Sequence, residues 1–193
     1  VLRNRPLHDR RVLNLQHYTV ASSDCVLDHD FIPKDLTAAY GTVTRDIIEH
    51  VKTVFTTTPY QIIGLHGDCH PGNILWRDNR AHFVDFDDAR NGPAIQDLWM
   101  LLSGDYSQRS LQIADILKGY TDFCDFDPVE LNLIEPLRAM RLLHYAAWLA
   151  RRWEDLAFPH NFPWFNTERY WAEHILSLRE QLAVLNEPVV RWL

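Results

Sequence analysis

One short region of the sequence gathers the side chains most able to do chemistry. Between Leu65 and Trp99, the stretch "LHGDCHPGNILWRDNRAHFVDFDDARNGPAIQDLW" places histidine, cysteine, asparagine and aspartate residues among glycines and bulky apolar residues. Three kinds of protein would use such a set. It suits a zinc-dependent hydrolase, a magnesium-dependent phosphotransferase, or a fold in which the polar loop has only a structural role.

The spacing of three oxygen-bearing side chains favours magnesium. Asp68 lies five positions before Asn73, and Asp85 lies twelve positions after Asn73. Mg2+ prefers hard oxygen ligands in near-octahedral geometry, usually one or two protein groups together with waters and phosphate oxygens. Asn73 and Asp85 could supply those two groups. Asp68 would then be a third oxygen, available to orient or deprotonate an attacking hydroxyl.

The two histidines of the same stretch raise the zinc alternative. His66 and His70 are four positions apart, and Cys69 lies between them. A catalytic zinc site normally has three protein ligands around an open position. However, Pro71 and the neighbouring glycines disfavour a helix that would place both imidazoles on one side. The structural alternative is that His66 hydrogen-bonds to the backbone and braces the loop, while Cys69 packs.

Hydrophobic periodicity predicts an α+β protein that is mainly α, with one small β element beside this loop. We expect irregular structure over 1–33. A helix is predicted over 35–55, followed by a strand in "QIIGL" and a hairpin formed by "NILWR" and "AHFVDF". The remainder is predicted to be helical and starts with a helix near Pro93. It continues with a helical face made of Ile113, Ile116, Tyr120 and Phe123, a long helix broken near Pro136, and a last helix from Trp171 to Leu185.

Composition limits the classes of partner. The net charge is −7, from 19 basic and 26 acidic residues, which argues against nucleic acid or an anionic membrane as the partner. The three cysteines form no C-x-x-C pair, so neither a disulfide framework nor a zinc ribbon is indicated, and a reducing cytoplasm is favoured. No apolar run is long enough to span a membrane. We expect a cytoplasmic monomer.

Two motifs carry a family resemblance. The segment "HGDCHPGN" fits the pattern H-x-D-x-x-x-x-N and resembles the catalytic loop of protein-kinase-like enzymes. The segment "DFD" at 85–87 resembles their metal-binding D-F-G, with Asp in place of Gly. Together these are similar to the aminoglycoside phosphotransferase and choline kinase branch. The segments "IEPLRAMRLLHYAAWLARRW" and "FPHNFPWF" extend the resemblance to the bacterial stress-response kinases of that branch.

The resemblance implies phosphoryl transfer from ATP, with Mg2+ as the metal. Asp68 would be the catalytic base, and Asn73 and Asp85 the cofactor-binding residues, as ligands of the magnesium that bridges the phosphates of ATP. Asp85 would thereby be essential to catalysis, Asp87 would assist a second ion or order the loop, and Asp97 would brace the loop through its backbone. The implied acceptor is a serine or threonine hydroxyl of a protein; the alternatives are a small hydroxyl compound, such as an amino alcohol, sugar or aminoglycoside, or a non-catalytic kinase-like binding module.

One family feature has no counterpart in this chain. Members of the family carry an N-terminal lobe with a glycine-rich loop and a strand lysine that hold ATP. The seven glycines here never form G-x-G-x-x-G, and the lysines, at 34, 52 and 118, lie on or beside predicted helices. We therefore expect residues 34–193 to be the helical C-terminal catalytic lobe, preceded by a connecting segment over 1–33, with the N-terminal ATP lobe absent. The chain also begins without Met, so we expect a fragment that could be inactive alone.

Overall fold

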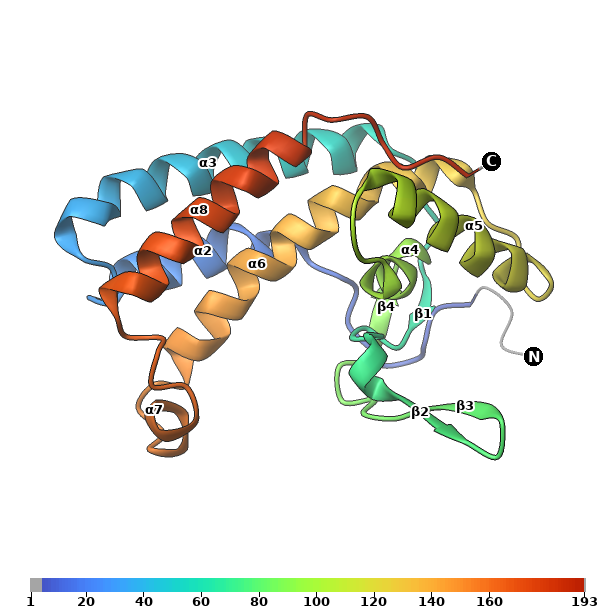
Figure 1. Cartoon of the computed structure of the whole chain (residues 1–193), viewed down its shortest axis with the longest axis horizontal. Coiled ribbons are helices and arrows are strands. Elements are labelled where there is room, and N and C mark those ends of the chain that lie inside the picture. Colours follow the sequence, from blue (N-terminus) through green and yellow to red (C-terminus); the bar gives the residue numbers. More distant parts are fainter. Residues whose placement is uncertain (1–4, 193) are drawn as a thin grey trace. The chain divides into compact units, whose positions relative to one another are not determined.

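The computed structural model describes residues 5–192, in two compact units that each combine distant parts of the sequence (Figure 1). Within the described residues, the first unit comprises 5–13, 57–134 and 188–192, and the second comprises 14–56 and 135–187. Residues 1–4 of the predicted connecting segment, and residue 193, lie outside the description.

The first unit contains the predicted β-hairpin. Strand β2 (Ile74–Arg77) pairs antiparallel with β3 (Arg80–Phe83). Asp78 and Asn79 join the strands with φ values of 51° and 61°. Both values lie in the left-handed region that a two-residue hairpin turn of this kind requires, and Asp and Asn tolerate it well. The turn chemistry visible in the sequence therefore produces the hairpin as predicted.

A second two-stranded sheet was only half predicted. Strand β1 (Ile63–Leu65) lies in the predicted "QIIGL" strand, but its antiparallel partner is β4 (Arg90–Gly92). The buried Asn91 also holds the N-terminal segment: its Oδ1 accepts from the Leu7 N–H at 2.6 Å, and its Nδ2 donates to the Leu7 and Arg10 carbonyl oxygens at 3.1 and 2.8 Å. Sequence "RNG" has no β-branched or aromatic residue, so propensity gave no sign of a strand.

Helical elements complete the first unit. They are the 3-10 turns η1 (Pro71–Asn73), η2 (Trp99–Leu101) and η3 (Pro128–Leu133), and the helices α4 (Ile95–Leu98) and α5 (Tyr106–Thr121). A capping box starts α5, because Asp105 accepts from the Gln108 N–H and Gln108 accepts from the Asp105 N–H. The predicted face of α5 is partly wrong. Phe123 lies beyond the helix end with 74% of its surface exposed, and Leu117 is buried instead.

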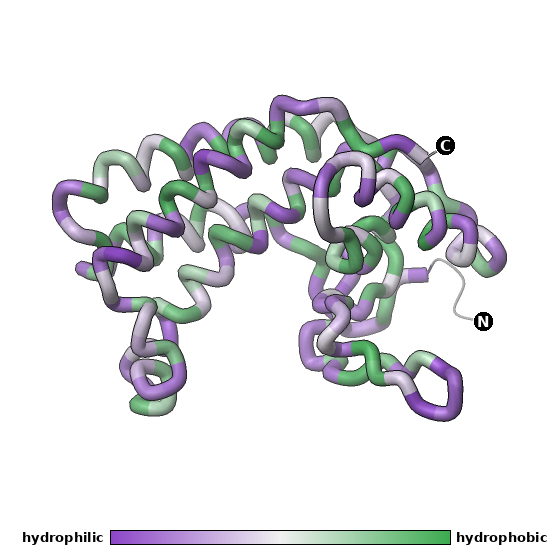
Figure 2. The backbone as a smooth tube through the Cα atoms, in the orientation of Figure 1, coloured by the Kyte–Doolittle hydropathy of each residue, from purple (hydrophilic) through white to green (hydrophobic). Residues whose placement is uncertain are grey.

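The second unit is helical. Its elements are α1 (Leu15–Tyr18), α2 (Val20–Asp28), α3 (Lys34–Thr57), α6 (Ile134–Arg151), α7 (Ala157–Asn161) and α8 (Glu168–Val184). Helix α3 confirms the predicted helix and buries Val43, Ile47 and Val51 at helical spacing. Hydrophobic and hydrophilic residues accordingly alternate along its tube in Figure 2. The predicted break near Pro136 corresponds to the junction of η3 and α6, where the proline occupies the first turn of the new helix.

Helices α1 and α2 correct the expectation of irregular structure before residue 34. The side chains that α2 buries are Ser22, Ser23 and Val26, so its inward face is largely polar. The Ser23 hydroxyl donates to the Thr44 hydroxyl of α3 at 3.0 Å, which satisfies the buried group. A helix held this way has no apolar stripe for periodicity to detect. Across the described residues, no helix combines the length and apolar content needed to cross a membrane.

Candidate active site

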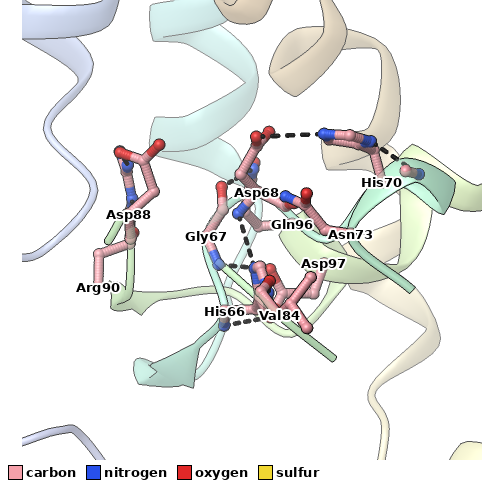
Figure 3. A network of polar contacts seen from close by, with 11 residues as sticks. His66, Gly67, Asp68, His70, Asn73, Val84, Asp88, Arg90, Gln96 and Asp97 are labelled. Atoms are coloured by element: carbon pink, nitrogen blue, oxygen red, sulfur yellow. Dashed lines mark hydrogen bonds and ion pairs between the residues drawn. The ribbon is translucent and has the colours of Figure 1, made fainter. Parts of the chain in front are cut away.

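The polar loop predicted to do chemistry connects β1 to β2, and one carboxylate, that of Asp97, holds its backbone (Figure 3). The His66 N–H donates to Oδ2 of Asp97 at 2.7 Å, and the Gly67 N–H donates to Oδ1 at 2.8 Å. Asp97 comes from α4, thirty positions further along the chain than Gly67. These two bonds confirm that Asp97 braces the loop through its backbone.

The surroundings of Asp97 make this anchor stiff. Burial raises the pKa of its carboxyl, while the N–H groups of Gly67 and His66 act in the opposite direction. A carboxylate that accepts two backbone hydrogen bonds in a poorly solvated place binds them more strongly than a neutral acceptor would. The loop therefore leaves β1 in a defined direction.

Gly67 allows the loop to lie close to the segment that follows the hairpin. Its φ is +89°, and a Cβ at this position would collide with the carbonyl oxygen of Asp88. Its own carbonyl oxygen accepts from Nε2 of Gln96 at 3.3 Å. Arg90 then fixes Asp88, donating from Nε to its carbonyl oxygen at 2.8 Å and from Nη2 to its carboxylate at 2.6 Å. Glycine is required here for both conformation and space.

His66 hydrogen-bonds to the backbone and braces the loop, which is the structural role expected if it does not bind zinc. Its Nε2 donates to the Val84 carbonyl oxygen at 2.8 Å, and its Nδ1 accepts from the Asp68 N–H at 3.4 Å. Its ring also packs on Phe86, with centroids 4.6 Å apart. Both ring nitrogens are thus engaged with the protein. Among the described residues, no three His, Cys, Asp or Glu side chains are arranged to hold a metal ion, so the zinc alternative has no ligand set.

Asp68 projects from the middle of the loop and is partly exposed. Its Oδ2 lies 3.5 Å from Nε2 of His70, and its carbonyl oxygen accepts from Nδ2 of Asn73 at 3.0 Å. The other ring nitrogen of His70 accepts from the Gly72 N–H at 3.0 Å, so the ring proton belongs on Nε2, toward Asp68. The loop thus brings Asp68, His70 and Asn73 together, as Figure 3 shows.

Asp85 lies at the same end of the hairpin as Asn73. The Val84 N–H donates to the Asn73 carbonyl oxygen at 3.1 Å, which continues the ladder one step past β3 and places Asp85 next. Asp85 has φ +63° and an exposed side chain. Within residues 5–192, its carboxylate makes no hydrogen bond or ion pair.

The donor atoms at this end suit a hard cation. Because the amide nitrogen of Asn73 is bonded to Asp68, its Oδ1 is left to accept or to ligate. Together with the Asp85 carboxylate it supplies the oxygen ligands that magnesium prefers. The residues therefore fit the metal that the sequence motif implies.

The neighbouring polar residues divide between structural and exposed positions. Asp88 is committed to Arg90, whereas the Asp87 side chain is exposed. Cys69 is buried, and burial raises the pKa of its thiol to about 11, which suits a packing role rather than a nucleophile. Gln96 was missed by sequence reasoning. It donates to Gly67 and accepts from Trp99 Nε1, and no motif marks it.

Comparison with known proteins identifies the family of the chain. The family model described as "Phosphotransferase enzyme family" (APH) matches residues 5–134, which include every residue of the loop, the hairpin and Asp97. The chain belongs to this family.

Its curated relatives are more specific. The chain is 49% identical over 179 residues to "Stress response kinase A" of Escherichia coli K12, covering 93% of this chain and 54% of that protein. It is 47% identical over 186 residues to "Serine/threonine protein kinase RdoA" of Salmonella typhimurium, covering 96% and 56%. The chain therefore spans about half the length of these relatives.

Solved structures confirm the predicted fold class. A choline/ethanolamine kinase family protein from Mesorhizobium loti matches with a TM-score of 0.62 and 18% identity, over 92% of this chain and 55% of that chain. An amicoumacin kinase in complex with AMP-PNP, Ca2+ and Ami matches with a TM-score of 0.56 and 13% identity, over 93% and 64%. The chain has the mainly helical, protein-kinase-like fold of these neighbours.

Proposed function

We propose that this chain carries the catalytic residues of an ATP- and Mg2+-dependent phosphotransferase whose acceptors are serine or threonine hydroxyls of proteins. The observation that carries the proposal is the loop geometry: Asp97 clamps two backbone N–H groups, and the loop so held presents Asp68 beside Asn73. Phosphoryl transfer depends mostly on positioning and charge neutralisation, and a well-anchored loop with a partly exposed carboxylate meets the first need.

Each polar side chain has a distinct part in this proposal. Asp68 holds the acceptor hydroxyl in line and takes its proton. Asn73 and Asp85 would hold Mg2+, which would neutralise charge on the phosphates of ATP when bound. His70 orients the Asp68 carboxylate from 3.5 Å through its Nε2.

The identity of the acceptor is supported by sequence rather than by geometry. Relatives at 47–49% identity are named stress response kinase A or serine/threonine protein kinase RdoA. That naming favours a protein acceptor and a role in a stress response. We further propose that the protein is a cytoplasmic monomer. The second candidate, a small hydroxyl compound, is favoured by the fold neighbours, of which one is an amicoumacin kinase and the other a choline/ethanolamine kinase family protein.

Replacement of Asp85 tests the proposal in a protein extended to the length of its relatives. Asn is the suitable substitute, because it tolerates the φ of +63° while it removes the charge. We expect Asp85→Asn to lower kcat by on the order of a thousandfold. Asp78→Asn, at a positive φ in the exposed hairpin turn, is the matched control and should leave kcat unchanged. Near-normal transfer by Asp85→Asn would contradict the assignment.

A second experiment separates the acceptor classes. The extended protein is given labelled ATP with a proteome extract in one arm and a panel of amino alcohols, sugars and aminoglycosides in the other. Labelled serine or threonine in the first arm supports the protein kinase. Labelling confined to the second arm supports the small-molecule kinase.

A further inference from the structure

An aromatic surface on the second unit remains unexplained by the catalytic residues. Its residues come from the C-terminal half of α6, from α7 and from the segment before α8, and Figure 1 shows where these elements lie in the chain. Its members are aromatic side chains with one arginine among them, and we call them the α6–α7 surface: Tyr145, Trp148, Arg152, Phe158, Phe162 and Trp164.

The rings of this surface form a continuous chain of contacts. Tyr145 stacks on Trp148 with an interplanar angle of 13° and centroids 5.9 Å apart. Trp148 meets Phe158 at 5.1 Å, and Phe162 meets Trp164 at 5.8 Å. Tyr145 and Trp164 nevertheless remain 43% and 42% exposed. Large side chains that are ordered by neighbours yet accessible to solvent are characteristic of binding surfaces.

The surface rests on a rigid base. Trp164 contacts Tyr170 at 5.1 Å, and Tyr170 contacts the fully buried Phe165 at the same distance. The start of α7 is also fixed, because Asp155 Oδ1 accepts from the Ala157 N–H at 3.0 Å. A surface already ordered in the free protein loses little conformational entropy when a partner binds.

Arg152 gives the surface its chemical preference. Its guanidinium carbon lies 4.7 Å from the Trp148 ring centroid and 5.8 Å from that of Phe158. In the described part of the chain its side chain makes no hydrogen bond or ion pair. A guanidinium stacked on a ring keeps its N–H groups in the plane, where they can bind two oxygens of a carboxylate or phosphate.

We propose that the α6–α7 surface docks a segment of the protein substrate in which an acidic group, a carboxylate or a phosphate, lies beside an apolar side chain. The inference rests on the proposed function and narrows its substrate class. Charge complementarity selects the acidic group for Arg152, and the exposed rings select the apolar neighbour. A single acidic group beside an apolar side chain suits one arginine among aromatic rings, whereas a nucleic acid carries a phosphate at every nucleotide and is repelled by the net charge of −7.

Peptide binding tests the inference without ATP. The probe is a fluorescein-labelled peptide in which glutamate alternates with leucine, and its anisotropy is measured with this chain. One companion peptide replaces the glutamates by glutamine, and another replaces one glutamate by phosphoserine. We expect the glutamine peptide to bind about tenfold more weakly, as expected for the loss of a charge-assisted hydrogen bond. A phosphoserine peptide that binds more tightly than the glutamate peptide identifies phosphate as the preferred group, and the reverse identifies carboxylate.

Variants of the chain assign the effect to one side chain. Arg152→Gln should weaken binding of the glutamate peptide about tenfold. Arg152→Lys should recover only part of this affinity, because lysine lacks the planar guanidinium that binds two oxygens at once. Arg179→Gln is the matched control, since Arg179 is exposed on α8 of the same unit. It should bind within about twofold of the parent chain. Equal melting temperatures show that each variant is folded.

Three results would overturn the inference. They are equal affinity for the glutamate and glutamine peptides, undiminished binding by folded Arg152→Gln, and binding of phosphatidylserine vesicles or an oligonucleotide without binding of the peptides. The outcome is separable from that of the proposed function. In the extended protein, Arg152→Gln should raise KM for a protein substrate about tenfold with kcat unchanged, whereas Asp85→Asn lowers kcat.

Discussion

At the scale of single residues, the loop is organised by Asp97 more than by any of the residues proposed to do chemistry. Its two carboxylate oxygens accept from two consecutive N–H groups, those of His66 and Gly67. An amide at this position has one acceptor oxygen, and its NH2 group would face a backbone donor. Asp97→Asn should therefore lower the free energy of unfolding by about 1–3 kcal/mol. Thermal melting of the variant measures this.

The control for that substitution is Asp78→Asn, in the exposed hairpin turn, where Asn suits the positive φ. The pair that Asp78 makes with Arg77 is more than four-fifths exposed on both sides, so its loss should cost almost nothing. Equal melting temperatures for Asp97→Asn and the parent chain would mean that the two loop hydrogen bonds contribute no stability.

Replacement by alanine should have opposite effects on stability at two of the glycines. Gly67→Ala places a Cβ against the Asp88 carbonyl oxygen at a φ of +89°, so it should destabilise the chain by more than about 1 kcal/mol. Gly41→Ala, within α3, meets no atom within 4 Å and should stabilise it by about 0.5–1 kcal/mol. Urea unfolding of both variants measures the difference, and a change of the same sign in both would contradict the argument.

The structure joins Asp68 and Asn73 by a hydrogen bond. Sequence reasoning at this scale predicted one polar site from the spacing of Asp68, Asn73 and Asp85, and the part of Asp85 in it stays a prediction. Such reasoning could not find Gln96, whose contact with Gly67 spans 29 positions of the chain, or Asn91, whose contact with Leu7 spans 84. Such partners are chosen by the folded arrangement, and their residue types alone carry no periodicity or motif.

At the scale of elements, α8 carries a buried histidine that makes the second unit sensitive to acid. His174 stacks on Tyr170 with an interplanar angle of 10° and lies against Tyr40 of α3. Burial lowers the pKa of its imidazole to about 4 from an ordinary value of 6.5. Between these values the unfolded chain binds a proton that the folded chain does not. The free energy of unfolding therefore keeps its full contribution from the neutral His174 above pH 6.5 and loses it as the pH drops toward 4.

This pKa shift of His174 corresponds to a loss of about 3 kcal/mol in the free energy of unfolding between pH 7 and pH 4. Urea unfolding across this range should show a smaller loss of stability for His174→Gln, which stays neutral, than for the parent chain. His160→Gln, an exposed position on α7, should follow the parent curve. Parallel curves for all three proteins would show that His174 does not contribute to the pH dependence.

Elements with a clear pattern were predicted, and elements made by tertiary contacts were not. Helix α3 has a buried apolar stripe, and the hairpin has a turn at Asp78 and Asn79 that favours positive φ. Both signals are visible in the sequence. Helix α2 buries serines, and β4 exists because its backbone pairs with β1, so neither has a pattern of its own. An element can be predicted when its own residue types stabilise it, and it is missed when its stability comes from contacts with another part of the chain.

At the scale of the whole molecule, the family's nucleotide-holding elements have no counterpart among the described residues. The chain contains no G-x-G-x-x-G, and its lysines lie on α3 and α5 rather than on a strand. If the polar loop and the hairpin are the only parts of this chain that contact ATP, they should hold it weakly. We therefore expect the melting temperature of this 193-residue chain to be unchanged by millimolar Mg-ATP.

A protein extended to the length of its relatives should behave differently. Saturation with Mg-ATP at about 100 times the dissociation constant adds about 2.7 kcal/mol, which is a rise of several degrees in melting temperature. EDTA should remove most of that rise, and so should Asp85→Asn. A magnesium-dependent rise in the short chain would contradict the prediction, because the polar loop and the hairpin would then bind nucleotide unaided. No rise in the extended protein would favour a non-catalytic binding module that keeps the kinase fold without its co-substrate.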